Sequence, residues 1–210
     1  MLFRSYYDEA NAIFEGYAYL RHFEQKIQMR EIKTETTTVR RQVFQQIVNG
    51  DPVAQTFIFP VDTYITGIDL FFKSISNEDN AEVFFEIRDT LLGQPTDSAL
   101  YQTTLDKALI RTSDNGTVST HIDFPEPIKL SATKYYSFVV GSGNVGFELW
   151  YSKMGNKDIV TNTLVESQPH QGVMLLSSNK NTWTPLQEYD ITFVLYKCKF
   201  KKEYEALPIS

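Results

Sequence analysis

The sequence predicts a mainly β protein, an antiparallel, jelly-roll-like β-sandwich with an N-terminal α-helix and an extended arm. Apolar residues recur at every second position in most segments after Asp51, turn residues separate these segments, and no helical pattern among them is long enough to connect parallel strands. An aromatic content of 14%, with 12 Tyr and 15 Phe, is also typical of β-structure. A length of 210 residues suits one domain with an appended arm.

The first predicted element is a helix over residues 8–29, where apolar side chains recur at steps of three and four. Gly16 interrupts this pattern at a cost of about 1 kcal/mol relative to Ala, and aromatic residues stand where a two-stranded coiled coil prefers Leu. We therefore expect the helix to pack on another protein surface. The residues expected to make that assembly contact are Ile13, Tyr17, Leu20, Phe23 and Ile27.

Residues 30–50 follow as a predicted extended arm. They are rich in β-branched residues, but they show no sustained alternation, and the Thr run is polar on all sides. With few apolar residues of its own, the arm would be ordered only by lying on something else. Residues 1–50 are thus predicted to form an assembly segment.

The predicted sandwich spans residues 51–200, followed by a short tail over 201–210. Its first strands are expected within 54–60, 64–74 and 81–89. Alternation gives two of them a defined apolar face: Ile68, Leu70 and Phe72 in one, and Val83, Phe85 and Ile87 in the other, with Glu82, Phe84 and Glu86 on the opposite side.

The later strands are expected within 116–130, 134–141, 147–152, 172–178 and 190–200, which gives eight or nine strands. The Asp114-Asn115-Gly116 segment is a strong turn signal. Apolar faces follow from alternation at Ile122 and Phe124, and at Tyr136, Phe138 and Val140. The absence of an internal repeat argues against a solenoid or a propeller.

Composition excludes several classes of function. A formal charge of −6, with no basic run longer than two residues, argues against a nucleic-acid groove. Cys198 is the only cysteine, so no intrachain disulfide and no cysteine-based metal site is expected, which fits a reducing cytoplasm. No stretch reaches the ~20 apolar residues of a membrane span, and acidic residues in the first ten positions argue against a secretion signal.

No metal, cofactor or catalytic centre is predicted. The three histidines, His22, His121 and His170, share no ligand spacing. There is no Gly-x-Ser-x-Gly motif, and the glycines of 141–146 precede a strand rather than a helix, so we interpret them as a hairpin turn. The Asn115 sequon is interpreted as part of the 114–116 turn.

Carboxylates are scattered along the chain. Glu82 and Glu86 share one side of a strand about 13 Å apart, and alternation directs both toward solvent. A glycosidase would need two carboxyl groups about 5–9 Å apart in a cleft. We therefore predict no enzymatic activity.

Trp150, Tyr151 and Trp183 are the candidate contact or ligand residues. Alternation in residues 147–152 places Trp150 on the same side as Glu148, so it is expected to be partly exposed. Exposed Trp and Tyr stack on sugars or anchor protein contacts. Packing in the sandwich, a protein interface and a glycan contact all stay open for these side chains.

Several ordered blocks of the sequence resemble a domain of virion structural proteins of contractile-tailed (T4-like) phages, which belong to baseplates and tail fibres. The resemblance covers about residues 51–200. Its first block is Asp-Pro-x-Ala-Gln-Thr-Phe over residues 51–57. The later matches are Ser152, Met154 and Gly155, then Gln168, Pro169, Gly172, Val173, Ser177, Asn179, Thr182, Trp183 and Thr184.

A wider similarity links the chain to jelly-roll modules of surface proteins, through a Gly-x-Pro turn and a phrase matched by Leu130, Tyr135 and Tyr136. Such modules look like carbohydrate-binding folds, yet they often serve only as scaffolds.

The resemblance implies a non-enzymatic structural component of a phage tail, made in the host cytoplasm and located in the virion. Expected partners are other tail or baseplate proteins and further copies of the chain, with a trimer as one arrangement. The alternative is a receptor- or glycan-binding tip domain of a tail fibre, which would use exposed aromatics and the loops at 141–146 or 155–172.

Overall fold

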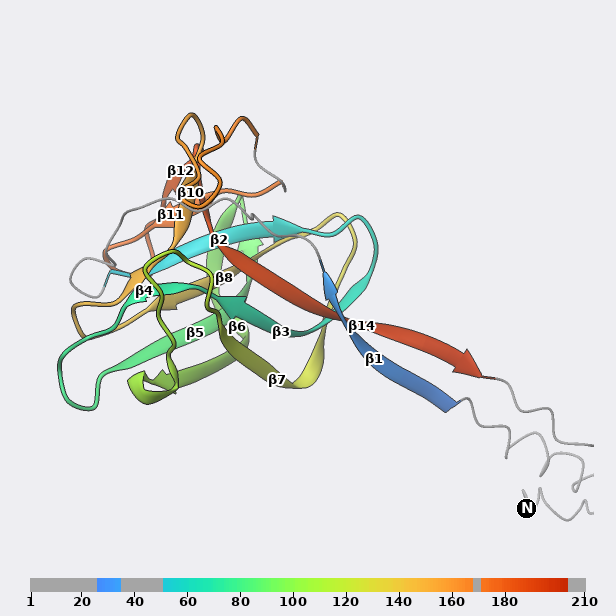
Figure 1. Cartoon of the computed structure of the whole chain (residues 1–210). Helices are drawn as coiled ribbons and strands as arrows, with labels where there is room; N and C mark the ends of the chain where they lie inside the picture. The colour runs from blue at the N-terminus through green and yellow to red at the C-terminus, as the bar shows by residue number, and fades with distance from the viewer. Residues whose placement is uncertain (1–25, 35–50, 168–170, 204–210) are drawn as a thin grey trace, which may run out of the picture. The chain divides into compact units, whose positions relative to one another are not determined.

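A computed structural model describes residues 26–34, 51–167 and 171–203 of the chain (Figure 1). The prediction of a mainly β, antiparallel fold is confirmed in these residues. Their elements, in order, are β1 (Lys26–Thr34), β2 (Val53–Ile58), β3 (Thr63–Leu70), β4 (Phe72–Ser74), β5 (Glu82–Leu91), β6 (Gln94–Asp106), the 3-10 turn η2 (Lys107–Leu109), β7 (Thr120–Leu130), β8 (Tyr135–Gly141), β9 (Glu148–Leu149), β10 (Tyr151–Lys153), β11 (Met174–Leu176), β12 (Thr184–Leu186), β13 (Tyr189–Ile191) and β14 (Phe193–Glu203).

The chain divides into two compact units. The larger unit is Glu31–Cys198, and it contains the sheets described below. The other comprises Met1–Arg30 and Lys199–Ser210, of which the structure describes residues 26–30 of β1 and 199–203 of β14. No helix in the described ranges has the length and hydropathy of a membrane span.

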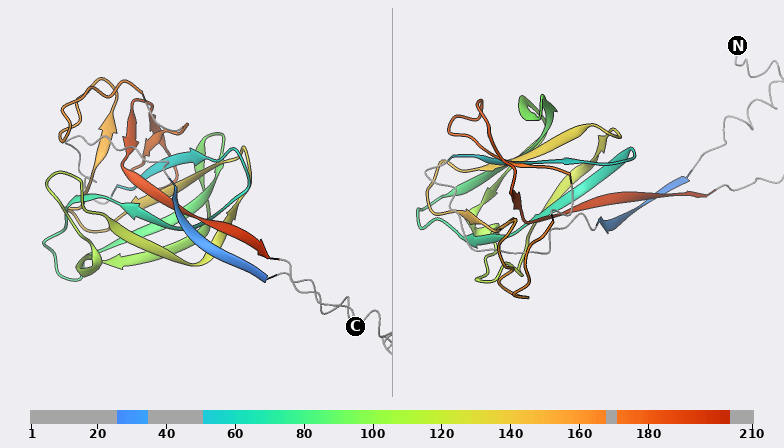
Figure 2. Two further views of the ribbon diagram at one scale, coloured as in Figure 1. Left: turned by 45° about the vertical axis from the view of Figure 1, so that its right-hand side comes forward. Right: turned by 90° about the horizontal axis from the view of Figure 1, so that it is seen from above.

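Two main sheets form the larger unit. One has six strands in the order β12-β11-β2-β8-β5-β6, and the other has the order β1-β14-β3-β7. Two short pairs, β10-β13 and β4-β9, complete it. The paired registers within these sheets are antiparallel. Consecutive strands such as β2 and β3 therefore belong to different layers, as the two views of Figure 2 also show.

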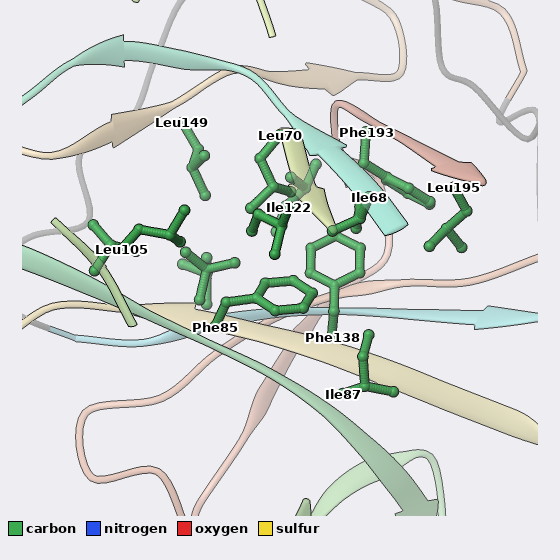
Figure 3. Close-up of a cluster of buried hydrophobic side chains, with 14 of the residues drawn as sticks. Ile68, Leu70, Phe85, Ile87, Leu105, Ile122, Phe138, Leu149, Phe193 and Leu195 are labelled. Atoms are coloured by element: carbon green, nitrogen blue, oxygen red, sulfur yellow. The ribbon is translucent and has the colours of Figure 1, made fainter. Parts of the chain in front are cut away.

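The core lies between the two main sheets. Figure 3 shows Phe85, Ile87 and Phe138 of the six-stranded sheet directed toward side chains of the other sheet. Phe138 makes an edge contact with Phe193, with ring centroids 5.0 Å apart, a favoured geometry for buried aromatics. The facing residues of the smaller sheet include Ile68, Leu70, Ile122, Phe193 and Leu195. The apolar faces predicted from alternation at residues 68–72, 83–87 and 136–140 are all buried.

The predicted N-terminal helix is wrong at its C-terminal end. Residues 26–29 belong to strand β1, so Ile27 lies in a strand. The reason is pairing, because β1 is hydrogen-bonded along β14 at the edge of a sheet. The other predicted assembly residues, Ile13, Tyr17, Leu20 and Phe23, lie outside the described residues, as does the arm beyond Thr34.

Two further details differ from the sequence-based expectations. The described chain has more strands than the eight or nine predicted, because β1 and the 13-residue β6 were not expected and several others span only two or three residues. The 141–146 segment is not a hairpin turn, since β8 pairs with β2 and β5 whereas β9 pairs with β4. It is a loop that crosses between strand pairs. The turn at 114–116 is present, with Gly116 at a φ of 64°.

Candidate functional site

Trp150 is buried, so the prediction that it is partly exposed is wrong. It lies between β9 and β10, with 1% of its surface exposed, and packs with Phe71 and Val194 on the outer face of the smaller sheet. Its indole Nε1 donates a hydrogen bond of 2.9 Å to the carbonyl of Ser113. The loop that contains Ser113 therefore meets the ring at the place where alternation predicted solvent.

Trp183 and Tyr151 are buried at other places in the fold. Trp183 packs against Ala54, Val139 and Leu175 on the outer face of the six-stranded sheet. Tyr151 lies in β10 beside Tyr189 of β13, with ring centroids 5.4 Å apart. The pKa of its hydroxyl is raised, mainly because the group is buried and also because Tyr189 is close to it. The three aromatic residues do not form one platform. The sequence left packing, a protein interface and a glycan contact open for these three side chains, and their burial corresponds to packing.

The Asp-Pro-x-Ala-Gln-Thr-Phe block of residues 51–57 forms buried hydrogen bonds. Gln55 of β2 lies on the core side, where its Nε2 donates to Asp190 Oδ1 at 2.9 Å and its Oε1 accepts from the Ile191 N–H at 2.9 Å. Gln55 and Asp190 are both fully buried. This amide connects β2 of the six-stranded sheet to β13, which leads into β14 of the other sheet.

The neighbouring motif residue Thr56 makes a second connection, on the outer side of β2. Its backbone N–H donates to the carbonyl of Val173 at 3.0 Å, and its Oγ1 accepts from the Val173 N–H at 2.8 Å. Val173 belongs to the later motif block that precedes β11. Residues far apart in the motif thus contact one another to hold the sheet together.

A charged cluster lies on the outer face of the six-stranded sheet. Glu86 and Arg88 of β5 form an ion pair with N–O distances of 2.7 and 2.8 Å, and both are buried. Arg88 also donates to the carbonyl of Thr96, at 2.8 Å. The expectation that Glu86 faces solvent is wrong, because Arg88 and the nearby loop cover it.

Lys180 completes this charged cluster from the 177–183 loop. Its Nζ lies 3.5 Å from the ring centroid of Phe84 and 3.8 Å from Glu86 Oε2. An ammonium group over an aromatic face is attracted by the ring quadrupole. The cluster therefore holds the 177–183 loop against the sheet, with two cations sharing the one carboxylate of Glu86.

A histidine between two carboxylates lies on the outer face of the smaller sheet. His121 Nδ1 is 2.6 Å from Asp69 Oδ1, and His121 Nε2 is 3.1 Å from Asp123 Oδ1. Tyr196 donates to Asp69 Oδ2 at 3.0 Å, and its ring meets the imidazole edge-on at 4.8 Å. The imidazole lies above Gly67, where an added Cβ would be 3.1 Å from the His121 ring and 2.8 Å from a backbone oxygen.

The protonated imidazole suits these surroundings, because both of its nitrogens face carboxylate oxygens. Burial alone lowers the pKa of His121, but the hydrogen bonds to Asp69 and Asp123 outweigh it, so the pKa is above its ordinary value of 6.5. Two carboxylates and one protonated imidazole thus make an ion-pair network on this face of the sheet.

Within the described ranges, no group of His, Cys, Asp or Glu side chains converges in a way that could hold a metal ion. His22 and His170 lie outside those ranges. Sequence patterns alone could not bring Asp69 and His121 together, because the two residues meet only through the pairing of β3 with β7. The one feature of the sequence that could have pointed to this network is Asp69, a charged residue within the apolar run of residues 68–72.

No protein-family model matches the sequence, and no curated protein shows significant similarity to it.

We predict that Arg88→Met lowers the free energy of unfolding by about 1.5–3 kcal/mol, because Glu86 loses its short hydrogen-bonded partner and keeps only the longer ion pair with Lys180. Urea unfolding measures the change. The double variant Glu86→Leu/Arg88→Met should lose less than the sum of its two single variants. As a control, Lys129→Met breaks the exposed pair with Asp62, in which both side chains are 54% exposed, and should leave the midpoint unchanged. Equal losses for Arg88→Met and Lys129→Met would contradict this assignment.

We also predict that His121 titrates above 6.5 and that Asp69→Asn lowers its pKa, as followed by NMR of the imidazole protons. A pKa raised by folding stabilises the protein fully below about 6.5 and loses that contribution as the pH rises through the folded-state value. Wild type should therefore exceed His121→Gln in stability by more at acidic than at alkaline pH. Asp123→Asn is the matched control with a smaller expected shift, since the Asp123 side chain is 81% exposed. A His121 pKa at or below 6.5 would refute the network.

Proposed function

We propose that the chain is a non-enzymatic structural component of a contractile phage tail, acting as a baseplate or tail-fibre adaptor that assembles through residues 1–50. The sequence blocks of residues 51–200 that resemble such proteins support this proposal. So does the position of their residues, because Gln55, Thr56 and Trp183 are buried and hold strands together. A motif made of framework residues is expected where the fold itself is the function.

We further propose that the sandwich has jelly-roll connectivity. Strands distant in sequence are neighbours in both sheets, as in β2-β8-β5 and β14-β3-β7, and the chain changes sheet between β2 and β3 and again between β7 and β8. Crossing between two antiparallel sheets in this manner is characteristic of jelly rolls.

The observation that carries the proposal is the burial of the large aromatic side chains. Trp150, Tyr151 and Trp183 have at most 8% of their surface exposed. A sugar-stacking site needs an exposed ring face, so these residues favour a scaffold over the alternative of a glycan-binding tip domain. The exposed large hydrophobic side chains of the described residues are chiefly aliphatic, and among them only Tyr135 offers an aromatic face on which a sugar could stack.

The remaining parts of the proposal concern setting and partners. The partners would be other tail or baseplate proteins, and the chain would be made in the host cytoplasm and reside in the virion. Its net charge of −6 and single Cys198 suit this setting and disfavour nucleic acid as a partner. No cofactor is proposed.

The test is complementation of a phage that lacks the chain. We expect the full chain to be present in purified virions by mass spectrometry and to restore infectivity. A variant lacking residues 1–25 keeps β1 and all later strands, so it should unfold as cooperatively as the full chain yet be missing from virions. Virions that contain no full-length chain would contradict the proposal.

A glycan array separates the alternative function. The structural proposal expects no glycan bound by the purified chain. Binding that is lost in Tyr135→Ala, which removes a partly exposed aromatic ring while leaving Trp150 and Trp183 in place, would favour the tip-domain alternative instead.

A further inference from the structure

The turn between β5 and β6 has an unusual residue at its tip. Leu92 and Gly93 connect the two strands with φ angles of 53° and 81°. Positive φ at both central positions defines a type I′ turn, in which Asn, Asp or Gly normally stands first. A bulky leucine in this conformation is strained. The turn lies clear of the neighbouring strands in the right-hand view of Figure 2, where it is green.

Pairing of β5 with β6 requires this turn, but no side-chain packing within the described chain offsets the strain at Leu92. The Leu92 side chain is 96% exposed, so it gains no burial. An exposed leucine could be replaced by Asn or Gly with relief of the backbone and no loss of packing. A strained residue whose side chain is almost fully exposed points to a contact outside the chain.

Three loops meet at this end of the sandwich. Thr90 Oγ1 donates to the carbonyl of Tyr135 at 2.8 Å, which ties the β5–β6 turn to the start of β8. The Ala132 N–H donates to Asp62 Oδ1 at 2.8 Å, which ties the β7–β8 loop to the β2–β3 loop. These loops carry exposed apolar side chains, which we call the hairpin-end patch: Val61, Leu91, Leu92 and Tyr135.

The rim of the hairpin-end patch carries both signs of charge. Asp62 pairs with Lys129 at 3.2 Å, and Asp89 pairs with Lys134 at 2.7 Å. These four groups sum to zero and the exposed Asp97 of β6 adds a single negative charge, so this surface is close to neutral, whereas the whole chain carries −6. Two copies of an acidic chain repel each other least where such a neutral surface faces its like. Moreover, a two-fold axis can place the lysines of one copy, Lys129 and Lys134, opposite the carboxylates of the other copy, Asp62 and Asp89.

We propose that the hairpin-end patch is a two-fold contact between two copies of this chain, in which Leu92 of each copy packs on the apolar loops of the other. A two-fold contact uses the same surface twice, so it needs a patch that has both a projecting and a receiving part. The Leu92 turn projects, and Val61 and Tyr135 offer apolar surface beside it. This contact goes beyond the proposed function and does not depend on it.

The test measures the solution mass of the full chain by sedimentation velocity. Leu92→Asn should weaken the two-fold association by about tenfold or more. At a protein concentration where the wild type is assembled and the variant is not, the mass should fall by half, even if residues outside the patch make further contacts. The same substitution should raise Tm by about 2–4 °C under conditions where both proteins are monomeric, because Asn tolerates the left-handed conformation. A gain in stability combined with a loss of association is not expected of a merely structural residue.

Leu109→Asn is the matched control, since it removes another exposed leucine at the far end of β6 and should change neither the mass nor the association. Charge reversal is a second test. Lys134→Asp alone should weaken the two-fold contact, whereas Asp89→Lys/Lys134→Asp should restore it, because the double variant again carries one charge of each sign. Wild-type mass that is unchanged by Leu92→Asn overturns the proposal, whether the chain is then a monomer or an assembly formed through residues 1–50.

Discussion

The side-chain amide of Gln55 is the contact on which the arrangement of the two sheets depends. It occupies a core-facing position of β2, between Val53 and Phe57, where the neighbouring side chains are apolar. Its bonds to Asp190 and to the Ile191 N–H fix β13, and β14 begins at Phe193. A buried polar group is costly unless it is fully bonded, so this amide permits one placement of the last strand against β2.

Local patterns in the sequence were sufficient for many of the sandwich strands and for their core faces, but not for β1 or for the 13-residue β6. Alternation placed Phe85 and Phe138 inside, because side-chain direction in a strand depends only on the position along it. The same patterns failed at Ile27, where the outcome depends on pairing between β1 and β14, which are far apart in the sequence. Helical spacing over residues 8–29 contained no information about that partner.

The candidate site was less predictable, because it depends on what covers the outer faces of the sheets. Alternation correctly put Trp150 and Glu86 on faces opposite the core, but Ser113 meets the Trp150 indole and Arg88 pairs with Glu86. His121 meets Asp69 only in the register of β3 with β7. Loop placement and register are tertiary properties, so residue types at Trp150 and Trp183 suggested a ligand surface where the fold has interior packing.

The central claim is that the motif residues are framework, and urea unfolding of Gln55→Leu tests it most directly. We expect a single transition, seen alike by tryptophan fluorescence and far-UV circular dichroism, with a loss of at least about 2 kcal/mol, because Asp190 and the Ile191 N–H each lose a buried partner. Val53→Ala, which trims an apolar neighbour on the same face of β2, provides a comparison for a loss of packing alone. A Gln55→Leu protein as stable as wild type would contradict the claim.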